Sequence, residues 1–113
     1  MIIHRVEHNR RRTPVDVEIC ETVLERGRGL LLRRCPGRRA AILLNPCSTV
    51  HTLGMTYRID VMFCDAHGRI LRIVEALPPF RIARCRDAQL VWEAGAGFAA
   101  HWGWQVGDRI APC

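Results

Sequence analysis

Alternation between hydrophobic and polar positions gives the first picture of the chain. Val15, Val17 and Ile19 alternate with polar or small residues, which predicts a strand with one face turned inward. Residues 40–44, AAILL, predict an apolar strand that ends at Asn45-Pro46. Shorter patterns predict further strands at 89–93 and 109–111. The chain is therefore expected to contain five or six short strands.

The clearest signal is a β-hairpin over residues 59–74. Residues 59–64 alternate so that Ile59, Val61 and Phe63 share one face, and an apolar run follows at 70–74. Between them, Asp65 can accept backbone N–H groups and start the turn. Gly68 can supply the positive φ that a G1 bulge requires.

Two short helices complete the predicted elements. Thr22 and Glu25 have the spacing of a capping box, so a helix is expected within residues 21–34. Gly27 and Gly29 weaken this helix, which should span one or two turns. Residues 98–104 predict a second short helix that Gly103 ends.

These elements predict an α+β fold that is mostly antiparallel β, built as a small barrel or a jelly-roll-like sandwich with one or two short helices. Residues 1–13 are expected to form a basic irregular lead-in, and residues 14–113 a single domain. A chain of 113 residues can bury one core without disulfides or metals. Its longest apolar run, 40–44, is far too short to span a membrane.

The charge is unevenly placed. Every basic residue other than histidine is arginine, and the formal net charge is +6, most of which falls within residues 1–39. This arginine-rich third could make the protein a weak nucleic-acid binder. Aromatic residues do not interleave with these arginines, so a solvated basic face is the favoured interpretation and nucleic acid is the less favoured partner.

The six cysteines indicate the compartment more than the chemistry. No CxxC pair is present, and residues 1–17 do not read as a signal peptide, so we expect a cytoplasmic protein with reduced thiols. Cys20 and Cys64 fall within predicted strands and should be small apolar core residues. Cys113 should be exposed.

The segment HTLGM at 51–55, followed by IDVMFCDAHGR at 59–69, resembles the domain-of-unknown-function 192 family. ALPP at 76–79, Cys85, VWEAGAG at 91–97 and GDRI at 107–110 extend the resemblance, and ERGRGLLLRR at 25–34 matches more loosely. The resemblance covers about residues 15–111. It implies a mostly-β, jelly-roll-like or barrel domain and supplies no reaction. Trp92 departs from the family, in which a smaller aliphatic residue is usual.

The loop at 46–60 carries the candidate site, and a non-enzymatic binding or accessory module is the favoured function. A peptide or protein laid against an open strand edge or against the basic N-terminal third is the expected kind of partner, and no cofactor is expected. The candidate ligand-binding residues are His51, Thr52, Met55, Asp60 and Glu93.

The alternative function is a soft-metal or thiol-based site. Cys47, His51 and Met55 stand four residues apart, a spacing that aligns them on one face of either a strand or a helix. With Cys85 or His101 they would suit copper or zinc. Ordinary burial of these side chains is the simpler interpretation. A Cys47–His51–Asp60 nucleophilic set is disfavoured, because no glycine-rich oxyanion turn adjoins Cys47.

The break at Pro78-Pro79 could return Cys85 to the neighbourhood of Cys47. If their Cα atoms lie within about 7 Å, mild oxidation should join them. Mass spectrometry of a digest would then show a peptide linking the two residues. Two separate thiols are the favoured alternative, and a digest with no such peptide would support them.

Overall fold

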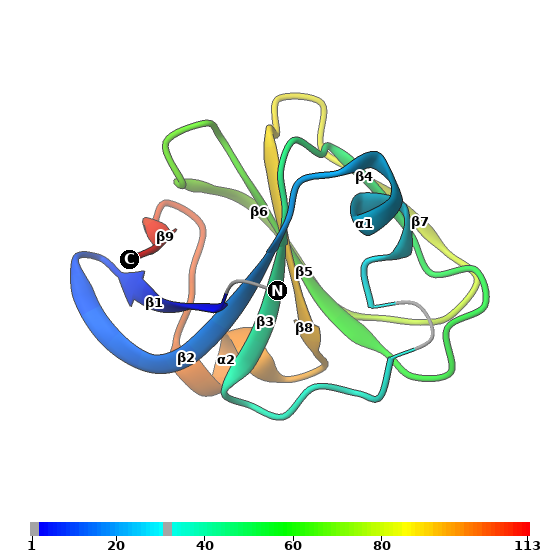
Figure 1. Ribbon diagram of the computed structural model, residues 1–113, viewed down its shortest axis with the longest axis horizontal. Coiled ribbons are helices and arrows are strands. Elements are labelled where there is room, and N and C mark those ends of the chain that lie inside the picture. The colour runs from blue at the N-terminus through cyan, green and yellow to red at the C-terminus, as the bar shows by residue number, and fades with distance from the viewer. Residues whose placement is uncertain (1–2, 31–32) are drawn as a thin grey trace.

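The computed structural model describes residues 3–30 and 33–113, which form nine strands and two short helices (Figure 1). The first two residues of the expected lead-in, and Leu31 and Leu32 of the expected helical segment, lie outside the described residues. Neither described helix is long and apolar enough to cross a membrane. In chain order the elements are β1 (Ile3–His8), β2 (Arg11–Cys20), α1 (Val23–Arg28), β3 (Ala40–Leu44), β4 (Thr49–His51), β5 (Ile59–Cys64), β6 (Ile70–Leu77), β7 (Ile82–Arg84), β8 (Leu90–Gly95), α2 (Phe98–Trp102) and β9 (Ile110–Pro112).

Seven strands form one sheet in the order β6-β5-β8-β3-β2-β1-β9, and β4 pairs with β7 in a separate sheet. Every pair is antiparallel except β2–β3, whose crossover contains α1. A single bridge between Arg69 and Arg109 brings the two edges of the large sheet together, but the described strands do not close into a barrel. The mostly antiparallel α+β class is confirmed, and the sandwich is the form that fits.

The middle of the large sheet is buried on both faces. All six side chains of β5 are buried. Met62 belongs to one core, which α2 covers with Phe98. Val61, which points the other way, belongs to a second core that includes Val50 of β4 and Ala83 of β7. The small sheet therefore packs on the face of the large sheet that lies opposite α2.

The first helix forms as its sequence predicts. The Thr22 hydroxyl accepts a hydrogen bond from the Glu25 N–H at 3.1 Å, and the Glu25 carboxylate accepts one from the Thr22 N–H at 3.0 Å. This capping box satisfies N–H groups that the first turn leaves without partners. The helix spans six residues and ends at Gly29, as the two glycines led us to expect.

The predicted hairpin is present as β5 and β6. The Asp65 carboxylate accepts hydrogen bonds from the backbone N–H groups of His67 at 2.8 Å and Arg69 at 3.0 Å. Gly68 has a φ of +84° and donates its N–H to the Asp65 carbonyl. The turn also contacts the last strand, because the Ile110 N–H donates to the Gly68 carbonyl at 2.9 Å.

The expectation of an irregular lead-in is wrong for its described part, where β1 and the start of β2 form a hairpin. Asn9 and Arg10 have φ values of +50° and +67°, which match a two-residue type I′ turn. Val6 is the only fully buried residue of β1. With one buried position among charged neighbours, the strand shows no clear alternation. On its other side β1 pairs with β9, so the first and last strands are neighbours.

Most other elements agree with the sequence. The predicted strand at 40–44 appears as β3 with the same ends, and those at 15–19, 89–93 and 109–111 appear as β2, β8 and β9 with shifted ends. The second helix ends before Gly103. Cys20 and Cys64 are buried and Cys113 is exposed, as expected. Hydrophobic periodicity did not predict β4 and β7, which have three residues each.

Replacing Gly68 should destabilise the fold. A Cβ at this position would lie 2.4 Å from the carbonyl oxygen of Ile110, and a branched side chain is strained at positive φ. We expect Gly68→Val to lower the free energy of unfolding by about 1–2 kcal/mol or more. Urea denaturation measures this, with Gly37→Val as control, because a Cβ on Gly37 meets nothing within 4 Å. Equal stability of the two variants would contradict the turn assignment.

Candidate functional site

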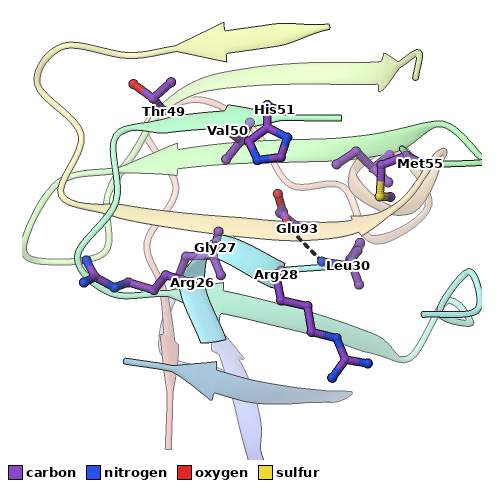
Figure 2. Close-up of a pocket in the computed structure, with 12 residues that line it drawn as sticks. Arg26, Gly27, Arg28, Leu30, Thr49, Val50, His51, Met55 and Glu93 are labelled. Atoms are coloured by element: carbon purple, nitrogen blue, oxygen red, sulfur yellow. Dashed lines mark hydrogen bonds between the residues drawn. The ribbon is translucent and has the colours of Figure 1, made fainter. Parts of the chain in front are cut away.

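A pocket of about 120 Å³ lies between α1 and the small sheet, on the side of the large sheet that holds the second core (Figure 2). Its floor is the large sheet, which contributes Leu44, Ile59 and Glu93. One wall is the end of α1 with the chain that follows it, residues 26–30. The facing wall is β4, residues 49–51, together with Met55. The pocket therefore opens in the space between α1 and the small sheet.

Glu93 is the only acidic residue in the pocket lining and comes from β8. It is 4% exposed, and its carboxylate accepts a hydrogen bond from the backbone N–H of Leu30 at 3.3 Å. Burial raises the pKa of this carboxyl to about 7, although the Leu30 N–H and the charge of Arg33 act in the opposite direction. A buried carboxyl of this kind holds its proton up to near-neutral pH.

The chain after α1 packs directly on this carboxylate. Gly29 has a φ of +49°, and a Cβ there would lie 2.6 Å from Oε1 of Glu93. Only glycine allows this approach, because any side chain would meet both the backbone strain and the carboxylate. Leu30 is held at its other end as well, since the Tyr57 hydroxyl donates to its carbonyl at 3.3 Å. The α1 wall is therefore anchored to the floor of the pocket.

The opposite wall carries two of the predicted ligand-binding residues. His51 is exposed at the end of β4, and Met55, 7% exposed, follows in the next loop. Figure 2 shows the Glu93 carboxylate rising from β8 toward the wall that carries His51. The structure thus brings His51, Met55 and Glu93 to one pocket, although Glu93 is far from the other two in the sequence.

The other two predicted ligand-binding residues are buried elsewhere. The Thr52 hydroxyl donates to the Pro78 carbonyl at 2.6 Å and accepts from the Arg81 N–H at 2.8 Å, which ties two loops together. Asp60 accepts hydrogen bonds from the N–H groups of Ala76 and Ala99, both at 2.9 Å. Both side chains are fully buried.

Asp60 and Glu93 point to opposite faces of the large sheet. Glu93 pairs with Val61 across β5 and β8, and Asp60 pairs with Ala94, one residue further along each strand. Asp60 therefore faces α2, where it accepts a backbone N–H of the first helical turn. It also satisfies the Ala76 N–H at an irregularity of the β5–β6 ladder. The two buried acids cannot form an acid–base pair.

The thiols of the alternative site lie around one end of the small sheet. Cys47 donates its S–H to the Thr49 carbonyl at 3.2 Å, and burial raises the pKa of this thiol. The Cys85 N–H donates to the carbonyl of Ser48, the residue after Cys47. Both cysteines are half-buried and free, and their oxidative pairing stays a prediction.

The structure does not bring the proposed metal ligands together. Among the described residues, no group of three or more histidine, cysteine, aspartate or glutamate side chains is placed to hold a metal ion. His51 lines the pocket over Glu93, and His101 lies on α2, where Arg38 contacts its Nδ1 at 2.8 Å. The two histidines are therefore associated with opposite faces of the large sheet.

Sequence reasoning missed the α1 wall of the pocket. Gly27 and Gly29 were interpreted as residues that shorten a helix, whereas Gly29 also lets the chain approach Glu93. Arg26, from the same wall, donates to the Pro46 carbonyl at 2.7 Å and so joins α1 to the loop before β4. A glycine-rich helix end was the only local signal for this wall.

The DUF192 family, described as "Uncharacterized ACR", matches residues 4–112 of the chain. No curated protein matches. Two crystal structures are similar in fold. A candidate transcription regulator from Sinorhizobium meliloti has a TM-score of 0.87 and 24% identity, over 98% of this chain and 94% of that one. A protein of unknown function from Novosphingobium aromaticivorans has a TM-score of 0.79 and 19% identity, over 96% of this chain and 82% of that one. At these identities the two likenesses show the fold alone, whereas the family match spans nearly the whole sequence, and the chain therefore belongs to the DUF192 family.

Proposed function

We propose that this protein is a non-enzymatic binding module whose ligand enters the pocket over Glu93. The observation that carries the proposal is the Glu93 carboxyl itself, which is 4% exposed and lines an open pocket. Among the described residues its one hydrogen-bond donor is the Leu30 N–H, at the long distance of 3.3 Å. A buried acid with unused acceptor capacity is costly, and a ligand that donates a hydrogen bond would offset that cost.

The pocket favours a ligand group of a particular kind. Leu44, Ile59 and Met55 form the apolar part of the lining around the single carboxylate. Arg26 and Arg28 also line the pocket, but their guanidinium ends point away from Glu93 (Figure 2). Its volume of about 120 Å³ is well below the ~300–1,000 Å³ of common cofactor and drug sites. The pocket is thus suited to one group the size of an amino-acid side chain. We infer a short apolar body that ends in an N–H donor, and an ammonium group would complement the ionised acid.

The other functions considered from the sequence have less support. The candidate regulator from Sinorhizobium meliloti suggests nucleic acid by its description, and this chain has an arginine-rich N-terminal third. However, several of those arginines contact other groups of the protein. Arg33 pairs with Glu18, Arg5 with Asp16 at 3.2 Å, and Arg26 with a backbone carbonyl. We therefore retain the pocket as the proposed binding site.

Isobutylammonium should bind in the pocket and isobutanol should bind much more weakly. Amide shifts in ¹H–¹⁵N spectra are expected at Leu30, His51 and Met55 as the amine is added. Glu93→Gln should weaken this binding about tenfold or more, since hydrogen bonds to charged groups are worth about 1.5–3 kcal/mol. Glu75→Gln, the same change at an exposed site, should leave it unchanged. Shifts elsewhere only, or equal binding by Glu93→Gln, would refute the proposal.

Stability should depend on pH through Glu93. Folding raises the pKa of its carboxyl from an ordinary value of 4.5 to about 7, so the folded state favours the protonated form. The associated stability is fully present below pH 4.5 and is lost as the pH rises through 7. Relative to Glu93→Gln, the native protein should lose on the order of 3 kcal/mol over this window. Urea denaturation at several pH values measures the difference, and parallel curves for the two proteins would contradict it.

A further inference from the structure

The edge of β4 that faces the pocket carries no strand in the described part of the chain, where β4 pairs only with β7. Hydrogen bonds at the two ends of this pair show which backbone groups are free. The Thr52 N–H donates to the Arg81 carbonyl at 2.8 Å, and the Cys85 N–H donates to the Ser48 carbonyl at 3.0 Å. Bonded pairs alternate along an antiparallel ladder, so Val50 bonds to Ala83.

By the same alternation, the backbone groups of Thr49 and His51 point away from β7. These two residues line the pocket, and α1 lies on its far side. The Thr49 carbonyl accepts the Cys47 thiol, a weak donor. The pocket is therefore bounded by a strand edge that can pair with a further extended chain, over a floor that contains a buried carboxylate.

We propose that the pocket binds an extended peptide that adds antiparallel to the free edge of β4 and places one ammonium group against Glu93. This inference rests on the proposed function, because it uses the same pocket and the same carboxylate. A small amine alone would satisfy Glu93 but leave the backbone of Thr49 and His51 without strand partners. An extended main chain has N–H and C=O groups at the spacing that both residues require.

The register defines which part of the peptide would reach Glu93. The peptide residue opposite Val50 would point to the same side as Val50, which is buried toward the floor. Its two neighbours would point outward, beside Thr49 and the exposed His51. The inward residue would therefore carry the ammonium group at the end of its side chain, as lysine does. This chain contains no lysine, so a strand from a second copy could not supply a lysine ammonium.

The first arm of the test uses acetyl-Thr-Val-Lys-Val-Thr-amide as the probe, with the dissociation constant measured by ¹H–¹⁵N titration. N-methylation of the two valines should weaken binding about tenfold or more, because their N–H groups would donate to β4. N-methylation of the lysine is the matched control and should have little effect, since that N–H points away. Acetylating the lysine amine, or using Glu93→Gln, should also weaken binding about tenfold.

A second arm changes the protein. His51→Pro removes an N–H that points away from β7, so the β4–β7 ladder stays intact and an edge strand tolerates the change. Binding should be lost in His51→Pro and kept in Glu75→Gln, an exposed position outside the pocket lining, with both variants checked for folding by their spectra. If Val-Val-Thr-amide with a free N-terminus binds and the blocked lysine peptide does not, the ammonium is an N-terminus and the proposed register is wrong.

Equal binding of the valine-methylated and unmethylated peptides would overturn strand addition. So would binding of isobutylammonium without binding of either peptide, and in that case the proposed function would survive. If neither the amine nor the peptides perturb the pocket, both proposals fail. The two failures are therefore distinguishable.

Discussion

Burial of the central strands on both faces is the constraint on which the rest of the structure depends. β5 has no exposed side chain, and β8 has none beyond its partly exposed first residue. A sheet of this kind needs a cover on each side. On one side α2 and the curled ends of the large sheet provide it. On the other side, the cover consists of two separate parts: α1 with the chain that follows it, and the β4–β7 sheet.

The two buried acids, one under each cover, differ in the hydrogen bonds that they receive. Asp60 faces the α2 side and receives two backbone N–H groups at 2.9 Å, so its carboxylate helps to join β6 and α2. Glu93 faces the side that α1 and the β4–β7 sheet cover together. Among the described residues it receives one N–H, at 3.3 Å, and it lines an open pocket. Because burial of a charge is costly without hydrogen bonds, the Asp60 side is the better satisfied of the two. Among the described residues, Glu93 is therefore the buried acid whose carboxylate keeps hydrogen-bond capacity for a ligand.

Local patterns in the sequence predicted the local structure well. Asp65 and Gly68 specify the hairpin turn, and Thr22 with Glu25 specifies the start of α1, because each motif acts over a few residues. β4 and β7 escaped prediction because three residues are too few to show a period. β1 escaped because only Val6 is fully buried among its charged neighbours.

The sequence named part of the candidate site, and sequence distance explains why it did not name the rest. His51 and Met55 were named from one loop, and Glu93 from a separate motif, yet all three line the pocket. Thr52 comes from the same loop as His51, but its hydroxyl is used by the Pro78 and Arg81 backbone, which no local pattern reveals. The contact between Gly29 and Glu93 joins positions 64 apart in the chain, so only the folded structure identifies the second wall.

The pairing of β1 with β9 has a consequence for how the protein is made. Residues 6–8 find their partners at 110–112, so this edge of the large sheet cannot form until the last strand has been synthesised. Translation delivers residues one at a time, from the N-terminus onward. A ribosome-bound chain would already contain the hairpin of β1 and β2 while its neighbour is still missing. An unpaired strand edge can associate with other chains, so the newly made protein passes through an interval in which β1 is exposed to mispairing.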